Sequence, residues 1–321
     1  PNQSNKSWVT NQYDRMVMTD TIQRSGSDAA IIRIHKKEKA IALAVDSSAN
    51  YCKAHPHTGG KQIVCENWRN LISVGAKPIA ITNCLNFGNP EDPKIMGEFA
   101  ECLLGIKEAC EFLDYPVVSG NVSLYNGTNK KNISPTPVIG GVGLISNINN
   151  TINHYFKKDK NIILQIGKNF GQLSQSIFLD EIYSITDGPP PEINLSNEKN
   201  NGLAILKIIH NKLVSSVHDI SSGGLLLALA EMAFNSGYGV KVDKPKHLYN
   251  LMEYYFSEDQ GRYLIEIEPD NLDKIKKILN ENNIFNEVIG KVQKDYFEVS
   301  GELKIKINEL YKINNSWYNN Y

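Results

Sequence analysis

Short apolar runs alternate with two stretches of helical apolar spacing between residues 30 and 145, which limits the chain to folds that pack helices on a sheet. Apolar residues three or four apart predict helices over Lys61–Val74, after a break at Gly59-Gly60, and from Pro93 to Leu113. The order β-β-α-β-α-β-β predicts an α+β sheet with helices on one face. The strands are predicted at Ala30–His35, Lys39–Asp46, Ile79–Thr82, Pro116–Val118 (a buried strand) and Pro137–Ile145.

The rest of the chain repeats this mixture, so the 321 residues predict two domains of α+β or α/β class. Further strands are predicted at Asn161–Ile166, Ser216–Ile220, Arg262–Glu268 and Asn286–Val292. Further helices are predicted over Glu198–Leu213, from Gly223-Gly224 to Phe234, and over Asn271–Asn282. The polar run Asn147–Thr151 reads as a boundary. We therefore predict a leading arm or linker (1–24), two domains (25–150 and 151–303) and a polar tail (304–321).

Charge and cysteine content exclude several classes of protein. Thirty-four Lys and Arg residues oppose 35 Asp and Glu residues, so the chain lacks the basic surplus of a general nucleic-acid binder. No apolar run approaches the roughly 18–20 residues that a membrane span needs, and the N-terminus shows no signal-peptide pattern. The five cysteines are odd in number and form no CxxC pair. We predict a reduced cytoplasmic protein, and the initial proline predicts a trimmed piece of a longer chain.

The segment Ser119–Asn126 is the first candidate for a binding site. An apolar strand leads directly into glycine, asparagine and serine within a predicted loop, Gly120–Thr128. Glycine lets backbone N–H groups approach a phosphate, and Asn or Ser oxygens suit Mg²⁺. An ordinary strand-to-hairpin turn would have the same composition, so both interpretations stay open. The segment lacks the GxxxxGK[ST] pattern of a P-loop.

Four oxygen-bearing side chains form the second candidate: Asp46, Glu66, Asn70 and Asp219. Glu66 and Asn70 are four residues apart and share a face of a predicted helix, whereas the two aspartates end predicted strands. Carboxylates and amides at such places suit Mg²⁺, a hard cation that bridges to phosphates. The alternative is a solvated helix face with two strand-end caps.

The segment Val217–Gly224 is the third candidate. A helix that begins after Ser-Gly-Gly offers free N–H groups to an anion, and His218 is a possible base. A histidine beside a carboxylate is more often a hydrogen-bonded structural residue, and Ser221 is equally typical of a helix cap.

Two further polar segments carry weaker signals. Ser257–Arg262 either lines a cleft or forms a loop after a helix. The histidines of His55-Pro56-His57 lack further nearby metal ligands, so a solvated loop is the favoured interpretation.

Taken together, these segments resemble phosphoribosylformylglycinamidine synthase, specifically its synthetase subunit, over about residues 10–300. The longest matching strings are LNFGNP and GNVSLYN. The other segments that carry the resemblance are Gly26–Ala30, Ile79–Pro90, Pro116–Asn126, Pro135–Leu144, His218–Gly224 and Glu258–Tyr263. The resemblance implies a two-domain unit like that of aminoimidazole ribonucleotide synthetase.

The family's synthetase subunit has two tandem copies of this unit, and the chain resembles only the second copy. The first copy carries the family's catalytic histidine, so the resemblance implies no catalytic residue here. It also implies the reaction: ATP phosphorylates the amide oxygen of formylglycinamide ribonucleotide, and ammonia then displaces phosphate to give the amidine. The implied partners are the N-terminal half of the enzyme, a glutaminase subunit that supplies ammonia, and a small accessory subunit.

The resemblance also assigns residues. Gly120 matches an ATP-contacting glycine, Asn121 a Mg²⁺-binding asparagine and Ser123 a substrate-contacting serine, whereas Asn83 stands where the family has an ATP-contacting aspartate. A pseudo-symmetric second site is implied as well. It takes Mg²⁺ at Asp46, Glu66, Asn70 and Asp219, and its structural nucleotide, such as ADP, touches Ser221.

The main functional prediction is therefore one half of an ATP-dependent, amidine-forming ligase that is inactive alone. A non-catalytic nucleotide-binding or scaffolding fragment is the alternative, and an independent homodimeric kinase or synthetase of the same superfamily is a third possibility. In the family the first domain's sheet pairs with a second like sheet. An isolated half would expose that sheet, so we predict a homodimer.

Overall fold

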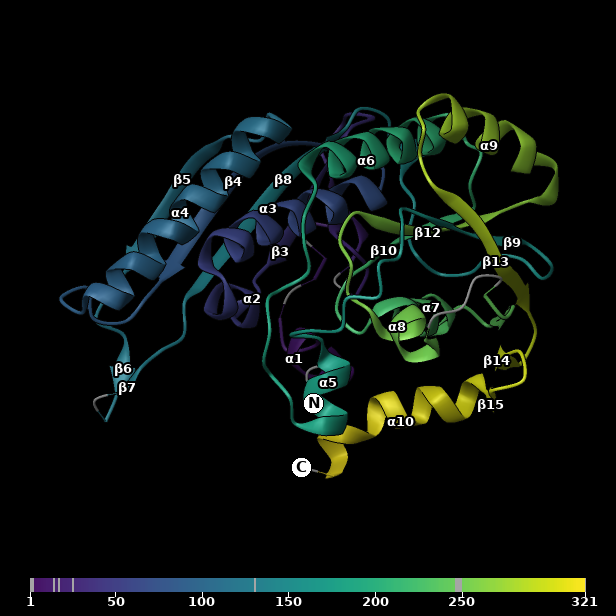
Figure 1. The fold of residues 1–321 in the computed structure, drawn as a ribbon. Coiled ribbons are helices and arrows are strands. Elements are labelled where there is room, and N and C mark those ends of the chain that lie inside the picture. The colour runs from purple at the N-terminus through teal and green to yellow at the C-terminus, as the bar shows by residue number, and fades with distance from the viewer. Residues whose placement is uncertain are drawn as a thin grey trace.

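The computed structural model of the chain describes residues 3–13, 15–16, 18–24, 26–129, 131–245 and 250–320. Within these residues the chain forms two mixed sheets that carry helices, as Figure 1 shows. The predicted α+β class is therefore confirmed. Among the described residues, no helix is both long enough and apolar enough to cross a membrane.

The first sheet has six strands in the order β1-β2-β3-β8-β4-β5, and only β4 and β5 run parallel. Its strands are β1 (Thr21–Gln23), β2 (Ala30–Arg33), β3 (Ala40–Asp46), β4 (Lys77–Asn86), β5 (Val117–Ser123) and β8 (Thr136–Ile145). A small separate hairpin pairs β6 (Gly127–Thr128) with β7 (Lys131–Asn132). Buried and exposed side chains alternate along β3, so one face of the sheet packs on helices and the other is open.

Helices α2 (Ala49–Ala54), α3 (Pro56–Ser73) and α4 (Pro93–Leu113) belong to this first unit. α3 contacts β3, β8 and α4, so it lies at the centre of the closed face. Both long helices carry proline in the first turn, where no backbone N–H is needed. The Asp92 carboxylate caps α4 by accepting a hydrogen bond from the Lys94 N–H at 2.9 Å.

The second sheet has seven strands in the order β10-β12-β9-β13-β11-β14-β15, and only β11 and β14 run parallel. Its strands are β9 (Ile162–Ile166), β10 (Ser216–Ile220), β11 (Gly239–Val242), β12 (Arg262–Ile267), β13 (Asn286–Gln293), β14 (Tyr296–Val299) and β15 (Leu303–Lys306). Its helices are α5 (Ile177–Tyr183), α6 (Leu195–His210), α7 (Gly224–Ala233), α8 (Leu251–Phe256) and α9 (Leu272–Glu281). Short 3₁₀ turns, η1 and η2, occupy Ile148–Asn150 and Pro269–Asn271.

One apolar core joins the two units. α3 of the first unit contacts α6 and β10 of the second, and Figure 1 shows α6 alongside α3. Trp68 and Leu71 of α3 belong to the same buried cluster as Ile205 of α6 and Val217 of β10. This packing brings the end of β3 and the end of β10 to α3, where polar residues meet.

Both chain ends contain regular structure. The predicted leading arm includes helix α1 (Ser7–Thr10) and β1, which pairs with β2. The predicted polar tail forms most of β15 and helix α10 (Ile307–Asn320), whose first residue Ile307 is buried. The two ends touch, because the Asn5 N–H donates to the Asn314 carbonyl at 3.0 Å. The domain limits at residues 150 and 303 stay predictions.

Three details of the first unit were predicted wrongly. Pro116–Val118 is not a buried strand, because β5 lies at the sheet edge and Val118 is 70% exposed. β5 also continues to Ser123, so the predicted loop from Gly120 begins later. Gly59-Gly60 does not break the chain but lies inside α3, where a Cβ on Gly60 would collide with the Cys102 carbonyl of α4. These glycines permit close helix packing.

Candidate functional site

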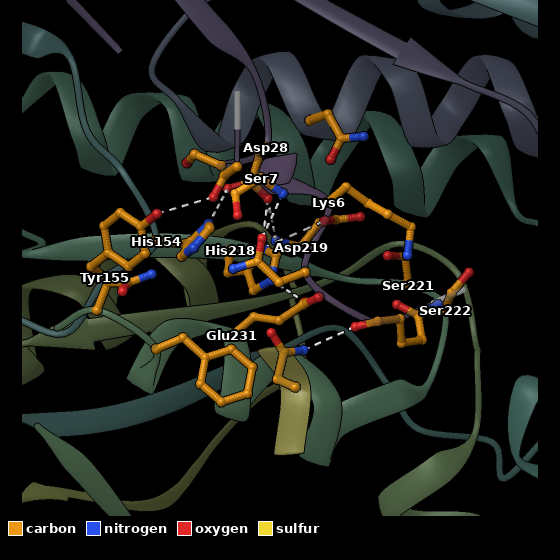
Figure 2. Close-up of a pocket in the computed structure, with 18 of the residues that line it drawn as sticks. Lys6, Ser7, Asp28, His154, Tyr155, His218, Asp219, Ser221, Ser222 and Glu231 are labelled. Carbon is orange, nitrogen blue, oxygen red and sulfur yellow. Dashed lines mark hydrogen bonds and ion pairs between the residues drawn. The ribbon is translucent and has the colours of Figure 1, made fainter. Parts of the chain in front are cut away.

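A cavity of about 780 Å³ lies where the two units meet, and Figure 2 shows the side chains that line it. Its lining residues come from the end of β3, one face of α3, the end of β10 and the turn before α7. Residues of the N-terminal segment, of the segments 26–28 and 154–155, of α7 and the turn after it, and of α10 line it as well. All four residues predicted as the oxygen-rich set line it, and so does Ser221: Asp46, Glu66, Asn70, Asp219 and Ser221. The fold therefore brings together residues that lie up to 175 positions apart in the sequence (221 − 46).

Hydrogen bonds hold the Asp46 carboxylate at the end of β3. Its Oδ1 accepts from the Asn70 side-chain amide at 2.8 Å, and its Oδ2 accepts from the Asn67 amide at 2.7 Å. The buried Tyr115 hydroxyl donates to Asn67 Oδ1 at 2.7 Å, which fixes the orientation of that amide. Asn67 was not predicted as part of the site. Its position three residues before Asn70 is the one signal for it.

Three carboxyl groups at this cavity resist ionisation. Burial raises the pKa of Asp46 to about 6 and, against the opposing effect of Arg69, raises the pKa of Asp219 to about 7. Burial and then repulsion from Asp46 raise the pKa of Glu66 to about 8. A cation placed among these groups would remove the repulsion and favour their charged forms. The carboxylate and amide oxygens are hard donors, so the set fits Mg²⁺.

Arg69 is a fully buried cation that faces the same carboxylates from α3. Its Nη1 lies 2.8 Å from Glu198 Oε1 of α6, and its Nε lies 3.5 Å from Asp219 Oδ2. Its Nη2 donates to Gln260 Oε1 at 3.0 Å. Burial opposes its charge, but Glu198 and Asp219 hold the pKa of Arg69 above its ordinary value. The guanidinium therefore links both units and positions the Asp219 side chain.

The Glu258 carboxylate fixes the turn that carries Ser221 by hydrogen bonds. Glu258 Oε1 accepts hydrogen bonds from the N–H groups of Gly223 and Ile177, each at 2.8 Å, and Oε2 accepts from the Tyr51 hydroxyl. The N-cap of α7 is Gly223, at a φ of 81°, so Ser221 is not its side-chain cap. Segment 257–262 is therefore a buried structural support, and Glu258 is 1% exposed.

Only one member of a second cluster of polar residues at this cavity was identified from the sequence. Asp28, His154 and Glu231 line it together with His218, which alone of the four was singled out there. His218 Nδ1 lies 2.6 Å from Asp28 Oδ1, and its Nε2 lies 3.0 Å from Glu231 Oε2. His218 is therefore hydrogen-bonded on both ring nitrogens. Asp28 falls within the Gly26–Ala30 segment, which offers the one sequence signal.

The residues predicted to contact ATP, Mg²⁺ and substrate in the shared active site lie elsewhere, on the neighbouring strands β4 and β5. Asn83 of β4 pairs in register with Gly120, and Asn86 pairs with Ser123. Gly120 and Asn121 are exposed, whereas Asn83 and Ser123 are half-buried. Asn83 also lines a shallow groove of about 490 Å³ together with the C-terminal part of α4. None of these four described residues lines the carboxylate cavity, that is, the cavity of about 780 Å³ where Asp46, Glu66 and Asp219 meet.

The histidines of His55-Pro56-His57 have ordinary structural roles. The His55 ring accepts a hydrogen bond from the Thr58 N–H at 3.2 Å and so caps α3. His57 Nε2 lies 3.3 Å from Glu108 Oε2 of α4. All five cysteines are free thiols, in agreement with the predicted lack of a disulfide framework.

Two family models and a curated relative match this chain. The family model "AIR synthase related protein, N-terminal domain" matches residues 26–145, and "AIR synthase related protein, C-terminal domain" matches residues 173–301. "Phosphoribosylformylglycinamidine synthase subunit PurL" of Pelagibacter ubique (strain HTCC1062) is 53% identical over all 321 residues. The chain spans only 44% of that relative's length.

Two solved structures from Thermotoga maritima share the fold. "T. maritima PurL complexed with AMPPCP" has a TM-score of 0.62 at 26% identity, covering 90% of this chain and 42% of that one. "Structure of PurLQS from Thermotoga maritima" has a TM-score of 0.70 at 18% identity, covering 89% of this chain and 46% of that one.

Proposed function

Because the chain belongs to the family of AIR synthase related proteins and is homologous along its whole length to phosphoribosylformylglycinamidine synthase subunit PurL, we propose that it forms one half, the C-terminal one, of that ligase. The full enzyme would convert formylglycinamide ribonucleotide, ATP and ammonia into the amidine in purine biosynthesis. The observation that carries this proposal is that all 321 residues of the chain align with the Pelagibacter ubique relative at 53% identity, whereas the chain spans only 44% of that relative's length.

The carboxylate cavity supports a nucleotide-binding role for this half. Asp46, Glu66, Asn70 and Asp219 would hold Mg²⁺, and Ser221 would contact the nucleotide, either ATP or ADP. A bound magnesium ion would neutralise phosphate charge there. Asn67 and Arg69 position two of these ligands through the contacts described above. The four proposed Mg²⁺ ligands and Ser221 all belong to this chain, so we propose that this chain binds the nucleotide on its own.

The edge strand β5 supports the second part of the proposal, a shared active site. Gly120 would leave room for ATP, Asn121 would hold Mg²⁺ and the Ser123 hydroxyl would contact the substrate. Because Gly120 and Asn121 are exposed at the sheet edge, these groups have an open side that a second chain could complete. The proposed partners are the N-terminal half of the enzyme, a glutaminase subunit and a small accessory subunit. Alone, the chain would form a homodimer without turnover.

The five free thiols are in keeping with a reducing compartment, and we include a cytoplasmic location in the proposal. One observation favours a different function. Asn83 stands at the position where the resemblance implies an ATP-contacting aspartate, and an amide supplies no charge. A chain that only binds nucleotide at the carboxylate cavity and scaffolds a partner would tolerate this substitution.

A chimera separates the two functions. The segment of Pelagibacter ubique PurL that matches this chain is replaced by residues 1–321, and amidine formation is measured with ATP, formylglycinamide ribonucleotide and ammonium salt. The ligase proposal predicts turnover by this chimera and little turnover when it carries Asn121→Ala. It also predicts that Asn83→Asp in the chimera leaves turnover unchanged or raises it.

A chimera that folds and binds nucleotide but forms no amidine would contradict the ligase proposal and favour the scaffolding function. Circular dichroism and thermal unfolding show whether each variant is folded. Lys94→Ala is the matched control, since Lys94 is exposed on α4 and forms only a surface ion pair with Glu98.

A further inference from the structure

Three side chains from distant parts of the chain converge at one wall of the carboxylate cavity. Asp28 lies in the turn before β2, His154 lies between η1 and β9, and His218 lies on β10. One ligand atom from each lies within 4.8 Å of the others, and Figure 2 shows them pointing toward one another. The magnesium proposal uses none of these three residues as ligands, although the Asp219 N–H donates to Asp28 Oδ1 at 3.4 Å.

Two atoms of this group are buried without a hydrogen bond. His154 Nδ1 and Asp28 Oδ2 have no hydrogen-bond partner, although their side chains are 7% and 0% exposed. The two atoms lie 3.4 Å apart. Burying a polar atom without a hydrogen-bond partner costs free energy. A ligand that accepts electron pairs from both atoms would remove this cost, and a metal ion is such a ligand.

The third member is oriented by a carboxylate behind it. His218 Nε2 lies 3.0 Å from Glu231 Oε2 of α7. When the neutral ring donates its Nε2–H to Glu231, its lone pair is on Nδ1, which faces Asp28 Oδ1 at 2.6 Å. Carboxylate–histidine pairs of this kind are the usual support of metal-binding histidines.

The donor types select the class of metal. Two imidazole nitrogens and one carboxylate oxygen suit Zn²⁺ and related transition-metal ions, whereas Mg²⁺ prefers oxygen donors alone. Ligand bonds of about 2.0–2.1 Å in a tetrahedral site place ligand atoms roughly 3.3 Å apart. His218 Nδ1 lies 2.6 Å from Asp28 Oδ1, His154 Nδ1 lies 3.4 Å from Asp28 Oδ2, and one ligand atom from each residue lies within 4.8 Å of the others. Side-chain rotations would bring the three donors to the tetrahedral spacing.

We propose that Asp28, His154 and His218 bind one Zn²⁺-class ion, with Glu231 as the positioning carboxylate and the fourth coordination position facing the cavity. Water or an anionic group of a ligand in the cavity would fill that position. The proposal is independent of nucleotide binding and of amidine formation. Without an ion, the same atoms would form a buried imidazolium between the Asp28 and Glu231 carboxylates. The test below separates these two states.

The test is metal binding by the 321-residue chain without nucleotide. We expect calorimetry at pH 7 to give one Zn²⁺ per chain, and we expect Co²⁺ to produce visible absorption bands that Zn²⁺ removes and excess Mg²⁺ does not. His154→Gln should abolish the Co²⁺ spectrum. Glu231→Gln should weaken Zn²⁺ binding about 10–100-fold, as loss of the carboxylate that accepts a hydrogen bond from a metal-binding histidine does.

His35→Gln is the matched control, because the exposed His35 pairs with Asp20 at 3.0 Å and is not among the residues that line the cavity. It should leave metal binding unchanged. Absence of Zn²⁺ binding by the unmodified chain, or equal binding by folded His154→Gln, would overturn the proposal and favour the imidazolium. If His154→Gln does not fold, Glu231→Gln decides, since its side chain is 38% exposed, and an unchanged affinity would overturn the proposal.

Discussion

The side chain of Arg69 connects the stability of this chain with the geometry of its cavity. A buried ion pair is costly to break from one side, because the remaining carboxylates keep their charge without compensation. We predict that Arg69→Met lowers the free energy of unfolding by about 3–5 kcal/mol, measured by urea denaturation. Lys94→Met, which removes an exposed ion pair, should cost about 0–1 kcal/mol. Equal losses in the two variants would contradict the structural role of Arg69.

The acid groups of the cavity predict a pH-dependent magnesium affinity. The pKa values of Asp46, Asp219 and Glu66 are raised to about 6, 7 and 8, so these groups hold protons at pH 6 that they release toward pH 8. Because Mg²⁺ binds the ionised form, its affinity should rise with pH across this window, and binding should release protons. Calorimetry in two buffers of different ionisation enthalpy measures the release. Constant affinity from pH 6 to pH 8 would contradict the carboxylate cavity as the magnesium site.

Among the helices and strands, the spacing of apolar residues predicted those elements that pack in the interior of each unit. The predicted strand Ser216–Ile220 has the bounds of β10, and the helix predicted from Pro93 to Leu113 has those of α4. A helical stripe and a fully buried strand leave strong patterns, because their neighbours are apolar throughout. The sequence did not show that β5 is exposed, since an apolar strand looks the same whether its own chain or a second chain covers it.

The pairing of β4 with β5 predicts a specific role for one glycine. A Cβ on Gly120 would collide with Asn83 Oδ1 and lie 2.8 Å from the Asn83 carbonyl oxygen. We predict that Gly120→Ala displaces the edge strand, lowers the melting temperature and abolishes amidine formation in the chimera. Gly97→Ala is the matched control, because a Cβ at this exposed α4 position meets nothing within 4 Å. The control should be neutral or stabilising by up to about 1 kcal/mol, and a harmless Gly120→Ala would contradict the close pairing.

For the whole molecule, the open face of the first sheet is an apolar surface that the helices of this chain do not cover. The β3 side chains of Ile41, Leu43 and Val45 point away from the helices and are 37%, 40% and 73% exposed. An uncovered apolar face of this kind favours association with a second like sheet. We therefore predict a dimer in light scattering, which Leu43→Lys should dissociate, since Leu43 lies on this face but does not line the cavity. Ile182→Lys, which changes an exposed apolar residue of α5, should not affect it. A monomer over a wide concentration range would contradict this prediction.

The candidate site could be predicted only in part, because it forms between the two units. Strand ends and helix spacing identified Asp46, Glu66, Asn70 and Asp219 as a set, and the fold places all four at one cavity. Asp28, His154 and Glu231 lie in segments without a local pattern, so only the folded chain shows that they reach the same cavity. The roles of Asn83, Gly120, Asn121 and Ser123 stay predictions, since none of the four lines the cavity where the carboxylates meet.

The decisive measurement is calorimetry of magnesium-ADP binding to the unmodified 321-residue chain and to two variants, Asn121→Ala and Asp219→Asn. We expect the unmodified chain and Asn121→Ala to bind alike, because the proposed ligands at the carboxylate cavity belong to this chain. We expect Asp219→Asn to weaken binding at least about tenfold, or 1.4 kcal/mol. Loss of binding in Asn121→Ala with unchanged binding in Asp219→Asn would contradict it and move the nucleotide to the edge strand.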